Sequence, residues 1–186
     1  MTTNCIDMLM QLTIPELLYG TYVRPAVDFA RDYFQDMPVI CLEIGVAYGD
    51  NTKRMAEKLN IDTFYLIDPY EDYSDFAWSI PIPDSFDFLP SLDLDKKIRL
   101  IPMQMTSSEA FNNLSNASID FIYIDGNHVY EFIKEDLSYW DKVKKGGILS
   151  GHDIWIPDVK QAVTEFADEN CLNLYTAFPD WWFVKT

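Results

Sequence analysis

Five apolar, strand-like runs alternate with helical segments along this chain of 186 residues. Such alternation is typical of parallel βαβ units, because two parallel strands need a crossover connection that a helix usually supplies. The sequence therefore predicts a single α/β domain over 1–186, with a mostly parallel twisted sheet, helices on both faces and a C-terminal β-hairpin. The expected strands are 38–44, 63–67, 98–102, 119–124 and 148–150, followed by LNLYT and WWFVK in the hairpin.

Helical patterns fill the connections between these strands. The second helix should begin with Asp50 or Asn51 as its N-cap, because a short polar side chain can accept from the first free N–H groups. The fourth helix should end at Gly146 and Gly147, since glycine is typical just past a helix C-terminus. The expected helices are 14–35, within an N-terminal helical region 1–37, and 50–59, 107–115, 128–145 and 158–169.

The connection at 69–95 follows neither a helical nor a strand period and is rich in proline, acidic and aromatic residues. Long irregular connections inside a compact domain are usually functional or disordered, and disordered segments are poor in aromatic residues. Two interpretations stay open: a lid over the substrate pocket, or a segment packed permanently on the domain or on a second subunit.

The chain is strongly acidic, with a formal net charge of -16 and a pI near 4.2. Binding to nucleic acid or to an anionic membrane requires a basic surface. The charge therefore argues against both partners and is compatible with a small or cationic ligand. A role of the acidity in solubility alone is an equally open interpretation.

Neither export nor membrane insertion is indicated. No apolar run approaches the ~20 residues that span a bilayer, and the start MTTNCIDMLMQLTIPELL lacks the basic region of a signal peptide. The three cysteines (Cys5, Cys41 and Cys171) are far apart, so the sequence predicts neither a disulfide framework nor a zinc knuckle. A cytosolic protein is expected, and a homo-oligomer is compatible with the sequence.

Small and acidic residues follow the first two strands. In VICLEIGVAYGDNT, Gly45 and Gly49 would let the backbone and the next helix approach a ligand closely. Their G-x-x-x-G spacing differs from the G-x-G-x-x-G of dinucleotide-binding folds. Asp68 ends the second strand, where an acid can accept hydrogen bonds from ribose hydroxyls. A tight βα turn at the glycines and a plain Asp-Pro turn at Asp68 are the structural alternatives.

Both histidines of the chain fall at predicted strand ends. Asp125 and His128 follow the fourth strand, and His152 and Asp153 follow the fifth. A single histidine is often a helix cap or a surface residue. Two at neighbouring strand ends favour a functional site, because ligands of open α/β sheets bind at the carboxyl ends of the strands.

Several stretches together resemble class I S-adenosylmethionine-dependent methyltransferases. VICLEIGVAYGDNT is similar to the glycine-rich motif of that family, LIDPY to the end of its second strand, and MTSSEA to the loop after its third. IDGNHVYE and GGILSGHD resemble a subgroup of bacterial and viral small-molecule methyltransferases. The resemblance covers roughly 38–186. It implies a Rossmann-like class I methyltransferase fold and S-adenosyl-L-methionine as the cofactor.

The resemblance also implies roles for individual residues. The glycine loop and Glu43 would receive the amino-acid end of the cofactor, Asp68 its ribose hydroxyls, and Asp125 its methionine part. Thr106 and Ser107 would lie near the adenine. The implied cofactor-binding residues are Glu43, Gly45, Gly49, Asp68, Thr106, Ser107 and Asp125.

The resemblance favours a hydroxyl acceptor, a sugar or another small molecule, for which a base must take a proton. His128 and His152 are the catalytic candidates. Related catechol-type and sugar O-methyltransferases hold a divalent metal at these strand ends, so Asp125 and Asp153 are candidate Mg²⁺ ligands, with His152 nearby. The catechol-type pattern has Asp-Asn where this chain has His152-Asp153, which leaves the metal open.

Two alternatives from other classes are a dinucleotide- or sugar-nucleotide-binding oxidoreductase and a non-catalytic module that keeps the cofactor pocket. The missing G-x-G-x-x-G argues against the first. The intact acids and histidines at the strand ends argue against the second.

Overall fold

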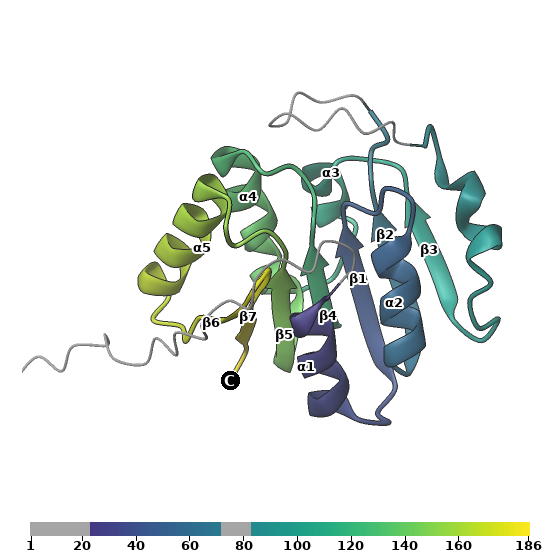
Figure 1. The fold of residues 1–186 in the computed structure, drawn as a ribbon, viewed down its shortest axis with the longest axis horizontal. Helices are drawn as coiled ribbons and strands as arrows, with labels where there is room; N and C mark the ends of the chain where they lie inside the picture. Colours follow the sequence, from purple (N-terminus) through teal and green to yellow (C-terminus); the bar gives the residue numbers. More distant parts are fainter. Residues whose placement is uncertain (1–22, 72–82) are drawn as a thin grey trace, which may run out of the picture.

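A seven-stranded sheet in the order β3-β2-β1-β4-β5-β7-β6 forms the centre of the computed structural model (Figure 1), which describes residues 23–71 and 83–186. The first five strands are mutually parallel, whereas β7 runs antiparallel to β5 and β6. This confirms the predicted mostly parallel sheet and C-terminal hairpin. The strands are β1 Val39–Ile44, β2 Ile61–Ile67, β3 Arg99–Met103, β4 Ile119–Ile124, β5 Val143–Gly151, β6 Tyr175–Ala177 and β7 Asp180–Val184.

Helices cover both faces of the sheet (Figure 1). One apolar cluster joins α1 and α2 to one face, and a second cluster joins α3, α4 and α5 to the other. The α-helices are α1 Pro25–Phe34, α2 Asp50–Lys58, α3 Ser107–Phe111, α4 Tyr130–Leu137 and α5 Pro157–Glu169, and the 3-10 helices are η1 Phe86–Leu92 and η2 Ser138–Lys142.

The central strands β1 and β4 are buried on both sides, which explains why VICLEI and IDFIYI are almost continuously apolar. Strands of this kind pair in parallel only when helices exclude water from both faces. Because Ile44 of β1 pairs with Ile124 of β4, the two strands end side by side at the carboxyl edge of the sheet. This edge therefore collects the residues that follow each strand.

The expected helix 128–145 is wrong in its second half. α4 ends at Leu137, η2 follows, and Val143 already belongs to β5, where it pairs with Ile119. The glycines lie inside this strand, and the N–H of Gly146 donates to the carbonyl of Lys185 at 2.7 Å. Pairing with β4 and with the C-terminal strand therefore outweighs the helical pattern of the local sequence, and β5 is longer than the expected 148–150.

The expected N-cap of the second helix is also wrong. Gly49 precedes α2, has a left-handed conformation (φ 78°) and offers no side-chain cap. The left-handed conformation disfavours a side chain there, and a β-carbon on Gly49 would also lie 2.7 Å from side-chain atoms of Phe88 and Leu92, which would have to shift. Asp50 and Asn51 are thereby displaced into the first turn.

Other boundaries differ at the ends of elements. α3 stops at Phe111, four residues before the expected end, and the first hairpin strand begins only at Tyr175. Of the expected helix 14–35, residues 25–34 are helical and 14–22 lie outside the described residues. Of the connection 69–95, residues 72–82 lie outside them, and 86–92 form η1.

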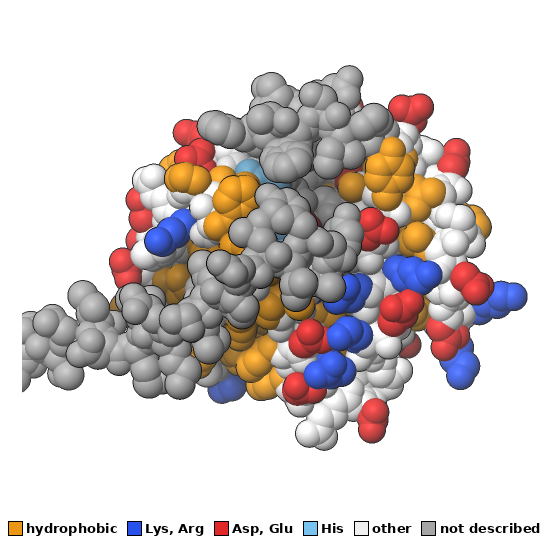
Figure 2. Space-filling model, in the orientation of Figure 1, with side chains coloured by type: hydrophobic (Ala, Val, Ile, Leu, Met, Phe, Trp, Pro, Cys, Tyr) orange, Lys and Arg blue, Asp and Glu red, His pale blue; other side chains and the backbone are white. Residues whose placement is uncertain are grey.

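Figure 2 shows Lys and Arg side chains gathered over α1 and α2, interleaved with Asp and Glu. Asp28 on α1 pairs with both Arg31 and Lys58, so the two helices are also joined electrostatically. The basic side chains here are thus largely balanced by acids. Within 23–71 and 83–186, none of the helices has the length and apolar character needed to cross a bilayer.

Candidate active site

The glycine loop after β1 lies against the end of β4. Gly45 has a left-handed conformation (φ 81°), and its N–H donates to the carbonyl of Ile67 at 2.9 Å. A β-carbon at Gly45 would lie 2.1 Å from the carbonyl oxygen of Asp125. Glycine is therefore required at this position, both by conformation and by the close approach of the two backbones.

Asp68 holds the same loop from the end of β2. Its Oδ2 accepts from the N–H groups of Val46 and Ala47, each at 2.9 Å, and its Oδ1 accepts from the N–H of Tyr70 at 2.9 Å. The hydroxyl of Tyr70 donates back to the carbonyl of Ala47 at 3.0 Å. Asp68 is thus the anchor of the glycine loop, in addition to the ribose contact that the resemblance implies.

Glu43 is an acid with no exposed surface, in the middle of the sheet. Its two carboxyl oxygens accept from Asn51 Nδ2 at 3.0 Å and Thr52 Oγ1 at 2.5 Å, so they tie β1 to the first turn of α2. Burial raises the pKa of Glu43 to about 8, against the opposing effect of these two hydrogen bonds. Both carboxyl oxygens of Glu43 thus accept hydrogen bonds from α2. The contact between Glu43 and the ammonium group of the cofactor stays a prediction.

Thr106 and Ser107 open α3, directly after β3. Thr106 forms a reciprocal capping box with Glu109, and the Ser107 carbonyl accepts from the Tyr139 hydroxyl at 2.7 Å. Thr106 lines a depression of about 440 Å³ together with Pro69 and Met105, among others. The depression lies between the ends of β2 and β3, which is compatible with the adenine contact that the resemblance implies.

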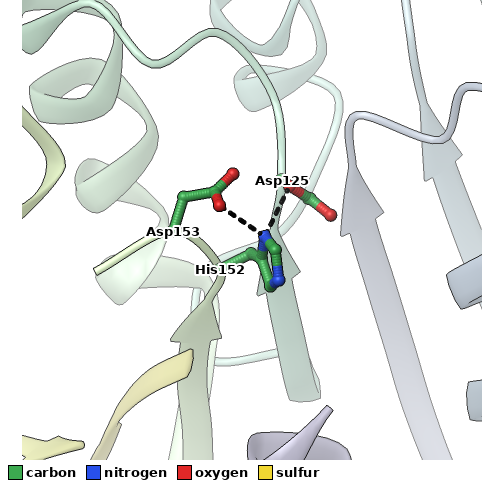
Figure 3. A group of neighbouring side chains, drawn as sticks. All are labelled: Asp125, His152 and Asp153. Carbon is green, nitrogen blue, oxygen red and sulfur yellow. Dashed lines mark ion pairs between the residues drawn. The ribbon is translucent and has the colours of Figure 1, made fainter. Parts of the chain in front are cut away.

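Asp125, His152 and Asp153 converge at the ends of β4 and β5 (Figure 3). Nδ1 of His152 lies 3.6 Å from Asp125 Oδ1 and 3.0 Å from Asp153 Oδ1. One ligand atom from each residue lies within 4.8 Å of the others, a spacing that suits a metal ion. The structure thus brings together both of the predicted metal ligands and one of the predicted catalytic histidines.

The second histidine joins this cluster from the segment before α4. Nε2 of His128 lies 2.8 Å from Asp153 Oδ2 and 3.9 Å from Asp125 Oδ1. Burial alone would lower its pKa, but the two carboxylates outweigh that effect and raise it to about 11. His128 is therefore a cation at neutral pH.

The remaining members of the cluster show the same electrostatic balance. Burial alone would lower the pKa of His152, but Asp153 and Asp125 raise it overall. Burial alone would raise the pKa of Asp153, but the two histidines hold it well below its usual range. The two carboxylates and the two imidazoles thus stabilise one another's charged forms.

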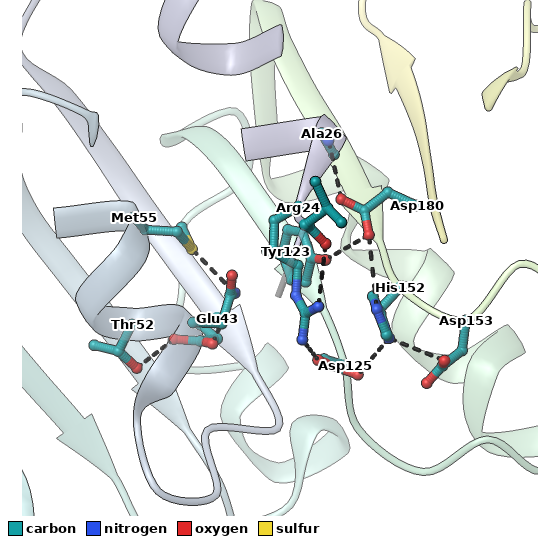
Figure 4. Close-up of polar contacts among 12 residues, drawn as sticks. Arg24, Ala26, Glu43, Thr52, Met55, Tyr123, Asp125, His152, Asp153 and Asp180 are labelled. Carbon is teal, nitrogen blue, oxygen red and sulfur yellow. Dashed lines mark hydrogen bonds and ion pairs between the residues drawn. The ribbon is translucent and has the colours of Figure 1, made fainter. Parts of the chain in front are cut away.

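Sequence reasoning missed two charged residues that extend this cluster (Figure 4). Arg24 precedes α1, and its guanidinium lies 3.5 Å from Asp125 Oδ2. Asp180 begins β7 and is fully buried, with its Oδ1 4.0 Å from His152 Nε2. Neither belongs to a motif, and a single charged residue before a helix or after a turn gives no signal of its own.

A comparison with protein-family models decides the family. The model described as "Methyltransferase domain" matches residues 42–154, from β1 to the residues just after β5. The chain belongs to this methyltransferase family. The match includes the glycine loop, Asp68 and the whole acid–histidine cluster, so the residues at the strand ends lie in a methyltransferase domain.

Similar solved structures show the same fold. The O-methyltransferase NovP has a TM-score of 0.62 at 18% identity, covering 87% of this chain and 79% of that chain. The calicheamicin methyltransferase CalS11 has a TM-score of 0.60 at 13% identity, covering 86% and 77%. A methyltransferase from Burkholderia thailandensis, solved with S-adenosylhomocysteine, has a TM-score of 0.54 at 13% identity, covering 88% and 77%. A search of curated proteins found no match.

The methyltransferase is therefore of class I and S-adenosylmethionine-dependent, as its family and fold imply. The family match leaves no support for the oxidoreductase alternative.

Proposed function

We propose that this methyltransferase transfers the methyl group of S-adenosyl-L-methionine to a hydroxyl oxygen of a small molecule, such as a sugar. The observation that carries the proposal is the acid–histidine cluster of Asp125, His128, His152 and Asp153, beside the glycine loop. Oxygen nucleophiles need a proton acceptor, which this cluster would supply. The fold is shared with NovP, an O-methyltransferase, and with CalS11, a TDP-rhamnose 3'-O-methyltransferase. The net charge of -16 disfavours a nucleic-acid acceptor.

The cofactor site is proposed along the ends of β1, β2 and β3. The sulfonium supplies an activated methyl group, so the protein's task is to align the acceptor oxygen with it and to exclude water. The loop from Gly45 to Gly49 would follow the amino-acid end, Asp68 would accept from ribose, and Thr106 and Ser107 would border the adenine. Asp125 would then lie between cofactor and acceptor, because its backbone packs against Gly45.

The acceptor proton has two candidate recipients, and we propose His152. His128 with a pKa of about 11 is already protonated at neutral pH. It would hold Asp153 in place through their ion pair. His152 presents Nδ1 toward Asp125 and Asp153, where an acceptor hydroxyl would enter. In its neutral form, the His152 ring would take the hydroxyl proton.

A divalent cation is the second way to activate the acceptor. Asp125, Asp153 and His152 would hold it, and it would polarise the acceptor oxygen. The short distances among these atoms fit such an ion, which would displace the proton from His152. His152 Nδ1 would then be a ligand, and the two roles exclude each other because one lone pair serves only one partner.

The test combines binding with turnover. Isothermal titration with S-adenosylhomocysteine should show a single site, and S-adenosylmethionine carrying a labelled methyl group should label hydroxylated acceptors in a panel of nucleotide sugars, free sugars and phenols. Amines of matched size form the control set. Cofactor binding together with methylation of amines alone would refute the O-methyltransferase proposal and leave the family assignment intact.

A further inference from the structure

Trp155 lies next to the acid–histidine cluster, but it belongs neither to the predicted site nor to the apolar core. It follows Asp153 by two residues, and 53% of its surface is exposed. An indole gains much hydrophobic free energy when it is covered, so a half-exposed tryptophan beside a site is a candidate for ligand contact. Because single exposed apolar residues are common, the contacts of Trp155 have to decide whether its position matters.

The backbone fixes the direction of Trp155. The N–H of Ile154 donates to the carbonyl of Pro179 in the hairpin turn at 3.1 Å. The N–H of Ile156 donates to the carbonyl of Asp153 at 2.9 Å. The side chains of Ile154 and Ile156 both pack against the apolar cluster that joins α3, α4 and α5 to the sheet. Trp155 between them is therefore turned outward, at the edge where β4 and β5 end.

The indole is also bonded to the cluster itself. Its Nε1 donates to Asp153 Oδ1 at 2.9 Å, and Nδ1 of His152 lies 3.0 Å from the same oxygen, which Figure 3 shows between Asp153 and His152. One carboxylate oxygen thus joins the two rings, so the indole lies beside the place where the acceptor hydroxyl would enter. Asp153 itself has φ 57°, a conformation that residues other than glycine rarely adopt and that is often kept at functional sites.

Exposed apolar side chains gather at this edge of the sheet. Within 23–71 and 83–186, eight large hydrophobic residues are exposed, and five of them lie in segments that begin or end at the carboxyl ends of the parallel strands. Ligand sites typically surround a few polar groups with apolar and aromatic side chains, so this edge suits an acceptor with an apolar face. The five residues are Val23, Tyr48, Phe132, Trp155 and Phe178.

We propose that Trp155 is a specificity-determining residue of the methyltransferase, whose indole carries the ring of the acceptor while a hydroxyl on that ring lies at His152 and Asp153. The acceptor class is then a ring compound with an apolar face and a hydroxyl at its edge, such as a sugar or a phenol. The inference rests on the proposed function for the transfer of the methyl group. The contact between Trp155 and a ring compound is measurable without turnover.

The contact is observed by ¹⁹F NMR on protein labelled with 5-fluorotryptophan, in the presence of excess S-adenosylhomocysteine. The Trp155 signal is the one that is missing in Trp155→Phe. Phenol and TDP-glucose are the ring probes, and at least one of them should shift the Trp155 signal saturably. Glycerol, which has hydroxyl groups and no ring, should leave it unchanged. A Trp155 signal that neither ring probe shifts, or that glycerol shifts equally, would overturn the proposal.

Two variants separate the ring of Trp155 from its N–H group, because Trp155→Phe loses only the bond to Asp153 and Trp155→Ala loses the ring as well. In ligand-observed NMR titrations, Trp155→Ala should raise the Kd of the ring probe roughly threefold to tenfold, as expected for one aromatic contact. Trp155→Phe should stay within about twofold of the wild type. Equal losses in both variants would mean that Trp155 only holds Asp153, which refutes the proposal.

Tyr33→Ala is the matched control, because Tyr33 is similarly exposed (42%) but lies at the other end of α1. It should bind the ring probe as the wild type does. Weakening by Tyr33→Ala as large as that by Trp155→Ala would show that the probe binds to exposed aromatic rings in general, and the proposal would fail.

Binding of S-adenosylhomocysteine is measured on the same samples. Its absence in the wild type would count against the proposed function, whereas a saturable shift of the Trp155 signal by a ring probe would still support the contact. A shift of that signal together with methylation of amines alone would likewise keep the ring contact and refute transfer to oxygen.

Discussion

Gly45 and Asp125 approach so closely that a β-carbon on Gly45 would lie 2.1 Å from the carbonyl oxygen of Asp125. Neither residue can move alone, because Gly45 is bonded to Ile67 and Asp125 to Ile44 through their N–H groups. The contact joins the ends of β1 and β4, where cofactor and acceptor would meet.

Gly45→Ala should therefore be far more disruptive than an alanine at another left-handed glycine. Gly146 has a similar φ of 78° but open space around it, so Gly146→Ala should cost roughly 1–2 kcal/mol for the conformation alone. Gly45→Ala adds a backbone clash and should cost about 3 kcal/mol or more in urea unfolding, with loss of S-adenosylhomocysteine binding. Equal destabilisation by the two variants would show that the contact with Asp125 relaxes easily.

Asp68→Ala should weaken S-adenosylhomocysteine binding by roughly tenfold or more, because charge-assisted hydrogen bonds are lost. The structure adds a second consequence: the N–H groups of Val46 and Ala47 lose their acceptor, so the variant should also unfold at a lower urea concentration. Tyr70→Phe, which removes only the bond from the hydroxyl to Ala47, is the control and should bind nearly as the wild type. Wild-type affinity in a folded Asp68→Ala variant would contradict the ribose assignment.

Glu43 should make the free energy of unfolding depend on pH. Its pKa is 4.5 in a model peptide and about 8 in the folded chain, so between these values the folded state holds a proton that the unfolded state has released. Stability from this group is present below about pH 4.5 and is lost as the pH rises through about 8.

Glu43→Gln should thus gain stability relative to the wild type on going from about pH 5 to about pH 8, measured by urea unfolding at each pH. Glu109→Gln is the control, since Glu109 lies on the surface and bonds to Thr106 lower its pKa. The difference should stay nearly constant for that variant over this pH range, because Glu109 is ionised in both the folded and the unfolded state there. A pH-independent difference between Glu43→Gln and the wild type would mean that Glu43 is ionised when folded.

Asp153→Asn should abolish or strongly weaken the binding of Mg²⁺ or Mn²⁺ measured by isothermal titration, if the ion is held by Asp125, His152 and Asp153. Asp168→Asn, at an exposed position of α5, should bind as the wild type. If the wild type binds neither ion and its turnover is unaffected by EDTA, the metal role is refuted and His152 remains the proposed proton acceptor.

Much of the fold could be predicted from the sequence, because the residue patterns that determine these elements are local. β4 has the predicted bounds 119–124, since a continuous apolar run between polar turns has few other solutions in an α/β chain. The glycines and acids after the strands were also readable, because the parallel order itself places strand ends together. The detailed contacts of these residues could not be predicted. For example, the hydrogen bonds of Asp68 to the glycine loop depend on how β2 lies beside β1.

The misread elements depend on distant partners. Val143 and Lys144 fit a helical period, and only pairing with β4 makes this segment a strand. Arg24 and Asp180 reach the cluster from opposite ends of the chain, which no spacing rule connects. Residues whose role is set by contacts across 100 or more positions are invisible to motif reasoning.

The open edges of the sheet carry a consequence for aggregation. The carbonyl of Met103 in β3 accepts from Asp68, so the neighbouring Pro102 turns its backbone to the outer side, where proline has no N–H to offer. At the other edge, β6 has only three residues. Neither edge gives an incoming strand a long row of free hydrogen-bonding groups, so the sheet is protected against growth by strand addition from another chain.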